Sequence, residues 1–398
     1  MLTNRSCPVC SCSNIERLQT LSFAADDGDV LPTDYEIVTC RRCGFVYDQL
    51  AASKEILSTH YARSTKYVRV QVGGSGDLSE VDKVRYQATI DFCKPYVGTE
   101  ASVVDVGCGK GGLLFWFQHN GYKKLMGVEP SMGCVEYTRK VFGIYSECAD
   151  IEHLPSGMAA DLVVISNVFE HLWDPIDAAR SVDGIVKEGG CVCVEVPDGS
   201  RYDKFFYAPY YSFDMEHINH FDLISMENLW GRLGYRVLDK VEYVGMPVEG
   251  RRIPMLRVIV QKATAKEKPL IVSRACEGIS RFINLSRRAE SALAQKMASL
   301  RTPVCYWGCG AYAKWFLNRF ETIPVGTPEF IVDRSASGDR RVGDIPVVRP
   351  EVFFASSERK AMNIIVTSVL YENEIRKSLM EGGCDRIYSA STGERLTR

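Results

Sequence analysis

The sequence lacks a surplus of charge and any long hydrophobic run. It contains 48 Lys and Arg residues against 50 Asp and Glu residues, for a formal net charge of −2. A nucleic-acid-binding protein is usually basic, so we expect no nucleic-acid partner. No apolar run reaches the roughly 18 residues of a membrane helix, and no apolar signal core follows the first residues. We therefore expect a cytoplasmic protein that neither enters a membrane nor is secreted.

The length of 398 residues is enough for two or three domains. Apolar residues make up 46% of the chain and charged residues 25%, so a core can form without disulfide bonds. Short apolar runs alternate with helical patterns over residues 80–262, within an expected domain at 66–262, and again over an expected domain at 301–398. This alternation is typical of βαβ units on a mostly parallel sheet. Between them, residues 263–300 begin as a polar linker and continue with a 3.6-residue apolar period, which predicts a long helix.

Fifteen cysteines is a high count, and four of them form two Cys-x-x-Cys pairs within residues 1–65. The pairs are Cys7 with Cys10 and Cys40 with Cys43, and together they complete a tetrahedral four-sulfur shell for zinc. Because all four ligands are cysteine, we expect a closed, structural zinc site in a small N-terminal domain. Four reduced thiols without a metal are the alternative, and Cys12 could replace Cys10 at a less usual spacing.

The most informative stretch is Val-Val-Asp-Val-Gly-Cys-Gly-Lys-Gly-Gly at 103–112, an apolar strand that runs into a glycine-rich turn. The glycines let the backbone approach a ligand closely. Asp105 stands two residues before Gly107, where it would repel a pyrophosphate but attract a sulfonium or an amino group. Glu129 follows Gly107 by 22 residues, a distance at which an acid can bind both ribose hydroxyls.

Further polar residues follow the next two predicted strands. Asp150 offers a carboxylate to an adenine amino group, and Ile151 can pack on the ring. Asn167 and His171 come directly after the apolar run 161–166, at the edge of the sheet where ligands bind. For His171, a turn histidine without a chemical role is an equally good interpretation.

These pieces, D-V-G-C-G-K-G, G-V-E-P-S, A-D-I and N-V-F-E-H-L in this order, resemble class I S-adenosylmethionine (SAM)-dependent methyltransferases. The resemblance implies that Asp105, Gly107 and Gly109 line the methionine end of SAM. It also implies that Glu129 holds the ribose and Asp150 the adenine. The protein is then expected to be an enzyme that transfers a methyl group to a small molecule.

The layout of nearly the whole chain resembles the three-domain sugar C-methyltransferases. Those enzymes have an N-terminal zinc-binding domain, a central methyltransferase domain and a C-terminal Rossmann-like domain, which implies an α/β protein with two Rossmann-like units. In that family a Glu-His pair sits above the methyl group, and the histidine removes a proton next to the keto group of a sugar. Glu216 and His217 match that pair. The alternative is that they cap and pack the helix expected at 225–233.

Two departures from the family pattern leave the acceptor atom open. Asp214 stands where the sugar enzymes have a tyrosine, and the segment 366–375 lacks their W-N-Y turn. Methylation at carbon with His217 as base is favoured, and an oxygen or nitrogen acceptor on another small molecule, again with His217 as base, is the alternative. The number of chains in the assembly is not predicted.

A second glycine loop fits the pattern G-x-G-x-x-A from Gly308 through Gly310, with Lys314 adding a positive charge and Asp333 following Gly308 by 25 residues. Three interpretations remain. The loop can help to hold a nucleoside-diphosphate sugar, it can be a scaffold without a ligand, or it can bind a nicotinamide cofactor in an oxidoreductase-like domain fused to the methyltransferase.

Two regions of the sequence are candidates for a lid over the expected site. The aromatic stretch 205–213 and the zinc domain at 1–65 both flank the expected site in sequence and look irregular. We therefore expect that deletion of residues 1–65 weakens acceptor binding more than cofactor binding. An RNA-modifying methyltransferase whose zinc ribbon binds RNA is a further alternative. It would need a basic face, but the basic pairs Arg41-Arg42, Arg251-Arg252 and Arg340-Arg341 are isolated from one another.

Overall fold

The computed structural model describes most of the chain. The described residues are 5–26, 31–50, 52–63, 78–248, 251–263, 270–300, 303–319, 323 and 325–397. The expected domain boundary at residues 65 and 66 and most of the expected polar linker, 264–269, lie outside them. No helix in the described part of the chain is both long and apolar enough to cross a membrane.

The chain folds as two compact units, and each is described by itself. The first comprises Met1–Glu16, Val38–Phe205 and Glu216–Gly278. The second comprises Arg17–Ile37, Phe206–Met215 and Ile279–Arg398. The expected division into domains at 1–65, 66–262 and 301–398, with a linker and long helix at 263–300, stays a prediction.

The first unit is built on a seven-stranded sheet in the order β10-β11-β8-β7-β4-β5-β6. Strands β8, β7, β4, β5 and β6 are parallel, and β11 runs antiparallel to β8 and β10. The parallel strands follow the order of a doubly wound fold, whose switch point lies between β4 and β7. The predicted Rossmann-like α/β fold of this region is confirmed. The strands are β4 (Ser102–Val106), β5 (Lys124–Glu129), β6 (Ser146–Cys148), β7 (Ala160–Ser166), β8 (Val186–Pro197), β10 (Arg236–Val248) and β11 (Arg251–Gln261).

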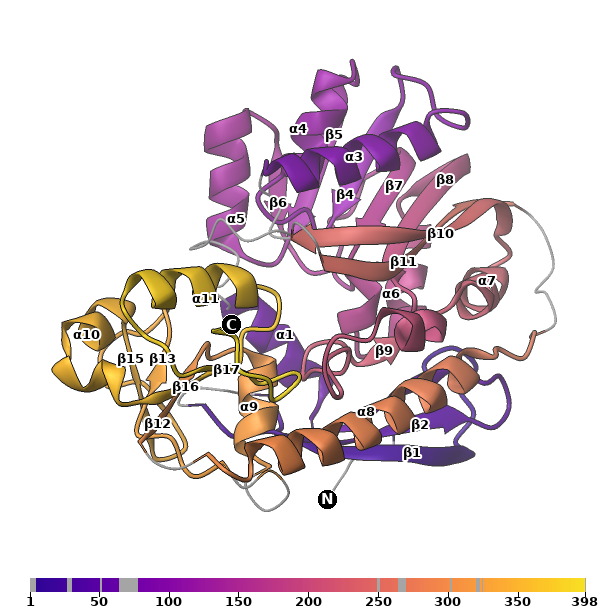
Figure 1. Cartoon of the computed structure of the whole chain (residues 1–398). Helices are drawn as coiled ribbons and strands as arrows, with labels where there is room; N and C mark the ends of the chain where they lie inside the picture. The colour runs from indigo at the N-terminus through magenta and orange to yellow at the C-terminus, as the bar shows by residue number, and fades with distance from the viewer. Residues whose placement is uncertain are drawn as a thin grey trace. The chain divides into compact units, whose positions relative to one another are not determined.

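Helices cover both faces of this sheet (Figure 1). Successive strand residues point to opposite faces, so Leu162 and Val164 pack with α3 and α4 whereas Val163 and Ile165 pack with α6 and α7. Because both faces are buried, β7 is apolar without alternation. The helices are α3 (Glu80–Cys93), α4 (Gly112–His119), α5 (Met132–Tyr137), α6 (Pro175–Asp183) and α7 (Leu223–Gly231), with short helical turns η1 (Thr138–Phe142), η2 (Phe169–His171) and η3 (Gly199–Phe205).

The helix expected at 225–233 begins two residues earlier, as α7. Asp222 is its N-cap and accepts the backbone N–H of Ser225 at 2.8 Å, while the Ser225 hydroxyl accepts the N–H of Asp222 at 2.9 Å. This reciprocal capping box fixes the first turn. Glu216 and His217 therefore lie before the cap and outside the helix.

A four-stranded sheet has the order β1-β2-β3-β9. Its strands are β1 (Ile15–Ser22), β2 (Asp34–Cys40), β3 (Val46–Leu50) and β9 (Asn219–His220), and α1 (Lys54–Arg63) follows β3. The two residues of β9 pair with β3 in an antiparallel register, His220 with Val46 and Asn219 with Tyr47. The segment that carries Glu216 and His217 is thereby attached to a strand about 170 residues earlier.

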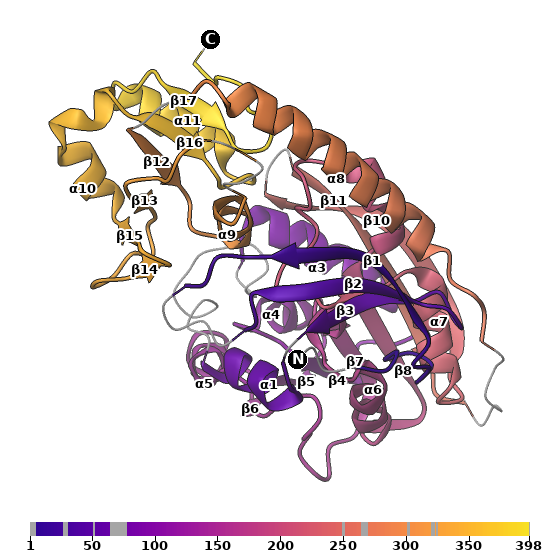
Figure 2. The same ribbon diagram turned by 90° about the horizontal axis from the view of Figure 1, so that it is seen from below.

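The second unit contains a six-stranded sheet in the order β14-β15-β13-β12-β16-β17 (Figure 2). All neighbours are parallel except β14 and β15. A second Rossmann-like domain stays a prediction, which this strand order supports. The expected long helix is α8 (Ala275–Met297). The other elements are β12 (Val304–Trp307), α9 (Ala311–Leu317), β13 (Ile331–Val332), β14 (Arg341–Val342), β15 (Ile345–Val348), α10 (Pro350–Ala355), η4 (Ser357–Lys360), β16 (Asn363–Val366), α11 (Glu372–Glu381) and β17 (Ile387–Ser389).

Candidate functional site

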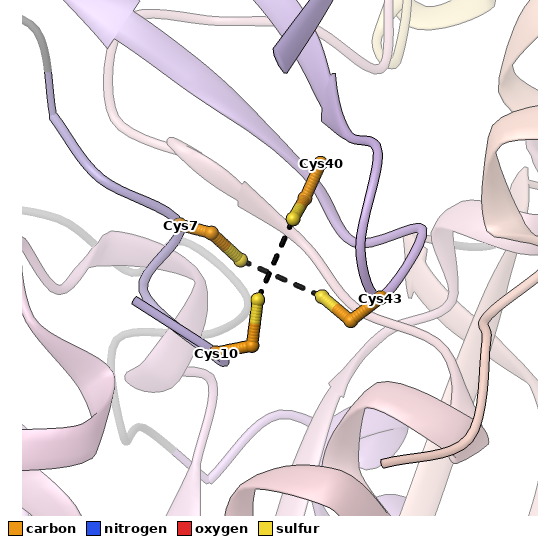
Figure 3. Close-up of side chains that lie close together, drawn as sticks. All are labelled: Cys7, Cys10, Cys40 and Cys43. Carbon is orange, nitrogen blue, oxygen red and sulfur yellow. Dashed lines mark hydrogen bonds between the residues drawn. The ribbon is translucent and has the colours of Figure 1, made fainter. Parts of the chain in front are cut away.

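The four cysteines of the two Cys-x-x-Cys pairs converge on one buried point (Figure 3). The sulfur atoms of Cys7 and Cys43 are 3.6 Å apart, and those of Cys10 and Cys40 are 3.5 Å apart. Zinc–sulfur bonds of about 2.3 Å in a tetrahedron separate the sulfurs by about 3.8 Å. The donor set and its spacing therefore fit a zinc ion.

The turn after the second pair requires glycine. Gly44 has φ +74°, and a Cβ there would lie 2.2 Å from the carbonyl oxygen of Ser273. Cys12 is not part of the four-sulfur cluster; its sulfur accepts the backbone N–H of Asn14 at 3.4 Å. The geometry thus favours Cys10 over Cys12 as the fourth member.

A pocket lies in the first unit, where β4, β5 and β7 end. This is the carboxyl edge of the sheet at its switch point, where doubly wound folds bind ligands. Its lining includes six of the seven residues that the sequence analysis assigned to the cofactor: Gly107, Gly109, Glu129, Asp150, Ile151 and Asn167. Their roles as cofactor contacts stay a prediction.

The first glycine turn is held close to the loop after β7. Gly107 has φ +80°, and a Cβ there would lie 2.4 Å from a methyl group of Val168. The backbone N–H groups of Gly109 and Ser131 donate to the Glu129 carboxylate at 3.1 and 3.0 Å. Burial raises the pKa of Glu129, and these two N–H groups oppose the rise. The carboxylate is therefore fixed at the end of β5, beside the turn.

Asp105, the seventh predicted cofactor residue, lies near the end of β4 and is not among the residues that line the pocket. It is 2% exposed, and burial raises its pKa to about 7, although the nearby Arg85 guanidinium opposes this rise. A carboxyl group in such a place changes charge near neutral pH.

Sequence reasoning missed a buried network of charges around the pocket residue Ser166. Arg85 on α3 donates to the Ser166 hydroxyl at 3.2 Å, and that hydroxyl donates to Glu195 at 3.2 Å. Arg257 donates to the same Glu195 carboxylate at 2.6 and 2.8 Å. Charged residues inside the apolar strands β8 and β11 were the available signal, since such groups are buried only with partners.

Two further predicted residues end strands or turns at the pocket. Asp150 accepts the N–H groups of Glu152 and His153 at 3.0 and 2.9 Å. Asn167 has φ +55°, a conformation that asparagine tolerates better than most residues. Its backbone N–H donates to the carbonyl oxygen of Glu195 at 2.8 Å. Strand β7 ends at the residue before it, Ser166.

Helix α1 supplies a wall of the same pocket through Lys54, Leu57, Ser58 and Tyr61. Lys54 forms an ion pair with Glu152, which also lines the pocket. The ring of Tyr61 lies 5.4 Å from that of His171. The sequence analysis did not identify these residues, because nothing local in α1 marks them as ligand contacts.

The two predicted catalytic residues, Glu216 and His217, adjoin the pocket through His171, which lines it. Since the carbonyl of Glu216 can only accept, the 3.0 Å contact from His171 requires that Nδ1 carries the proton. The rings of His171 and His217 are 4.7 Å apart, and His60 Nε2 lies 3.4 Å from the Glu216 carboxylate. The structure thus gathers three of the six histidines at one place.

The second glycine loop has different surroundings. Asp333 accepts the backbone N–H of Cys309 at 2.7 Å, and Gly308 has φ +108°. Lys314 lies 3.3 Å from the carboxylate of Asp26, which also forms an ion pair with Arg340 at 2.5 Å. The Lys314 and Asp26 side chains are only 8% and 6% exposed. The positive charge expected to meet a phosphate is therefore already paired with a carboxylate of the same unit.

Residues 80–240 match the family described as "Methyltransferase domain". A tRNA U34 carboxymethyltransferase of Campylobacter hominis is 29% identical over 113 residues, which cover 26% of this chain and 39% of that protein. This chain therefore spans about two fifths of the curated relative that it matches.

Solved structures are also similar. The N-methyltransferase NodS from Bradyrhizobium japonicum, solved with S-adenosylhomocysteine, is 12% identical with a TM-score of 0.40, over 51% of this chain and 97% of that one. A SAM-dependent methyltransferase from Anabaena variabilis is 15% identical with a TM-score of 0.43, over 53% and 96%.

The strand order, the pocket at the switch point and the family match together define a class I SAM-dependent methyltransferase domain. The class of enzyme predicted from the sequence is thereby confirmed. The acceptor is a separate question.

Proposed function

We propose that the protein transfers the methyl group of SAM to a small-molecule acceptor at the pocket of the first unit. One observation carries the proposal. Residues from the ends of three parallel strands, Gly107, Glu129 and Asn167, line a single pocket, and His171 in its wall touches His217. SAM supplies the electrophilic methyl group and the leaving group when it is bound.

The chain's own residues would bind and orient that cofactor. Gly107 and Gly109 would face its methionine part, where the close turn leaves no room for side chains. Glu129, held by two backbone N–H groups, would accept hydrogen bonds from the ribose hydroxyls. Asp150 and Ile151 would meet the adenine. Asp105 would attract the amino group from below the turn.

His217 is the proposed general base. Its ring lies 4.7 Å from His171, a pocket residue, and Glu216 carries a carboxylate next to it in sequence. A neutral imidazole can take a proton from the acceptor near neutral pH while carbon, oxygen or nitrogen attacks the methyl group. Helix α1 and the loop 168–173 would exclude water from the reacting groups.

We favour a nucleotide-activated sugar as the acceptor and carbon as the methylated atom, on the strength of the matching Glu216-His217 pair. Gly308, Gly310 and Lys314 would then help to hold the nucleotide. For this, the diphosphate must replace Asp26 as the partner of Lys314. The four-cysteine cluster would bind zinc as a structural ion, because all of its donors are thiolates and no position is left for a substrate.

Isothermal titration tests the proposal, with S-adenosylhomocysteine, dTDP, GDP, UDP and NADH in separate runs. Binding of S-adenosylhomocysteine is expected, together with one nucleoside diphosphate. If S-adenosylhomocysteine does not bind at millimolar concentration, the proposed function is wrong. Binding of S-adenosylhomocysteine alone points to another small-molecule acceptor, and binding of NADH points to an oxidoreductase-like second unit.

The role of His217 is tested by methyl transfer from radiolabelled SAM to a nucleotide-sugar panel. His217→Asn should reduce kcat at least a hundredfold and leave S-adenosylhomocysteine affinity within about twofold. His119→Asn on α4 is the matched control, because His119 stacks on Trp116 and is not among the pocket residues. Equal activity of the two variants contradicts a base role for His217.

A further inference from the structure

Arg5 is buried in the first unit and reaches two segments of the candidate site. It is 7% exposed. Its guanidinium donates to the carbonyl oxygens of Trp173 at 2.9 Å and Leu172 at 3.0 Å, and to Asn219 Oδ1 at 2.9 Å. Leu172 and Trp173 line the pocket, and Asn219 follows His217 by two residues. One side chain therefore joins the pocket wall to the segment that carries the proposed base.

Asn219 makes a second link between the same two segments. Its side-chain amide donates to the carbonyl oxygens of Phe169 at 2.9 Å and Leu172 at 2.7 Å. The next residue, His220, lies 3.2 Å from the carboxylate of Asp48 on β3, and both side chains are fully buried. The loop after β7 and the segment at 216–220 are thus held together by side chains and by few backbone bonds.

The geometry suits arginine and no other residue. A guanidinium offers five N–H donors in a rigid fork, whereas a lysine ammonium is a compact charge whose three donors all lie on one nitrogen. The cation also lies over the rings of Trp173 and Tyr47, at 5.1 and 5.5 Å.

The backbone of Arg5 ties it to the cysteine cluster. Its N–H donates to Gln49 at 2.8 Å, and its carbonyl accepts the Tyr47 hydroxyl at 3.1 Å. Cys7 follows two residues later, and Gln49 and Tyr47 belong to β3, just beyond Cys43. A formed cluster therefore keeps the strand and the chain before Cys7 in the positions that Arg5 needs.

We propose that Arg5 is a positioning residue, which sets the pocket wall at Leu172 and Trp173 and the segment of Glu216 and His217 relative to each other. The inference rests on the proposed function for its consequence in catalysis. Loss of the guanidinium would remove its hydrogen bonds to the carbonyl oxygens of Leu172 and Trp173 and to Asn219 Oδ1, and would allow the two segments to separate. The cysteine cluster then acts on the site through Arg5.

The test compares Arg5→Ala and Arg5→Lys with Arg232→Ala. Arg232 donates to the carbonyl of Val9, inside the first cysteine pair, and among the described residues its side chain donates to neither segment of the site. All three variants are assayed for zinc content, for S-adenosylhomocysteine affinity, and for amide hydrogen exchange of residues 168–173 and 216–220. The first two variants should bind S-adenosylhomocysteine at least about tenfold more weakly, and both segments should lose protection together.

Chemical rescue separates positioning from a general loss of stability. Millimolar guanidinium should restore S-adenosylhomocysteine affinity to Arg5→Ala but not to Arg5→Lys, where the ammonium occupies the site. Arg232→Ala should keep its zinc, wild-type affinity and the protection of both segments. Wild-type affinity and protection in Arg5→Ala would overturn the inference, and so would an equal loss in Arg232→Ala.

A second variant serves if Arg5→Ala does not fold. Asn219→Leu removes both the oxygen that accepts from Arg5 and the amide donors to Phe169 and Leu172. Protection of 168–173 should fall, and an unchanged exchange pattern overturns the inference. Wild-type protein that fails to bind S-adenosylhomocysteine contradicts the proposed function instead, while hydrogen exchange still tests the role of Arg5.

Discussion

The two glycine loops of this chain have similar sequences and different surroundings. In both, an apolar strand enters a G-C-G turn, and a carboxylate at the end of the next strand accepts a backbone N–H of the turn: Glu129 from Gly109, and Asp333 from Cys309. The first turn lines a pocket. Beside the second, Lys314 is buried against Asp26. The pattern specifies the backbone of such a loop, and residues far away in the chain decide whether a ligand can reach it.

Substitution of one glycine in each loop should give the largest difference in S-adenosylhomocysteine binding between the two loops. Gly107→Ala places a Cβ against Val168 at a positive φ and should abolish detectable S-adenosylhomocysteine binding. Gly310→Ala meets no protein atom within 4 Å at φ −82° and should leave folding and S-adenosylhomocysteine binding unchanged. Titration of both purified variants checks the prediction, and binding by Gly107→Ala at wild-type affinity would contradict the importance of the close turn.

Disruption of the cysteine cluster should weaken ligand binding at the first glycine loop and leave binding at the second unchanged. Cys40→Ser removes one of four zinc donors, so we expect loss of bound zinc and a fall in melting temperature on the order of 10 °C. Because α1 and Arg5 both depend on this region, S-adenosylhomocysteine affinity should fall as well. Cys12→Ser is the control, since Cys12 lies outside the cluster. Metal analysis and thermal melts measure the effect, and equal results for both variants would refute it.

This expectation revises the predicted role of residues 1–65. A lid over the acceptor would make deletion of this region weaken acceptor binding most. Four residues of α1 line the cofactor pocket, so cofactor binding should now fall at least as much. Titration of the deletion variant with S-adenosylhomocysteine decides between the two.

Binding at the first loop should depend on pH. Asp105 has a pKa raised to about 7, and in its proposed role only the ionised form would attract the amino group of the cofactor. S-adenosylhomocysteine affinity should therefore be constant above about pH 8 and fall by up to about tenfold for each pH unit below 7. Asp105→Asn should bind weakly at every pH and remove the dependence. A wild-type affinity that is flat from pH 5.5 to 8.5 would exclude this contact.

The smallest effect is expected at the second loop. Asp26→Asn removes the carboxylate that pairs with Lys314 and Arg340, so the affinity for the nucleoside diphosphate that binds should rise about threefold to tenfold. Asp34→Asn is a matched control, because Asp34 lies on the same hairpin and is exposed. An unchanged affinity would indicate that the second loop does not hold the phosphates.

Local sequence patterns were sufficient to predict much of the fold of the first unit. The apolar strand, the glycine turn and Glu129 lie within about 30 residues of one another. Their conformations depend on local steric limits and on strand burial, so a local pattern predicts them. For the same reason two Cys-x-x-Cys turns identified the four members of the cluster. The start of α7 was placed too late because the capping box of Asp222 and Ser225 was overlooked, although it is a local signal.

The tertiary structure alone decided which distant residues complete the candidate site. No sequence pattern marks Tyr61 on α1, Arg85 on α3 or Arg5. Each of them reaches the pocket, or the residues that hold its wall, through contacts with segments tens to hundreds of residues away in the chain. Glu216 and His217 could be proposed from a motif, but their place beside His171 depends on the two-residue strand β9 and on hydrogen bonds from Asn219. Periodicity reports which face of an element is buried; it does not report what that face packs against.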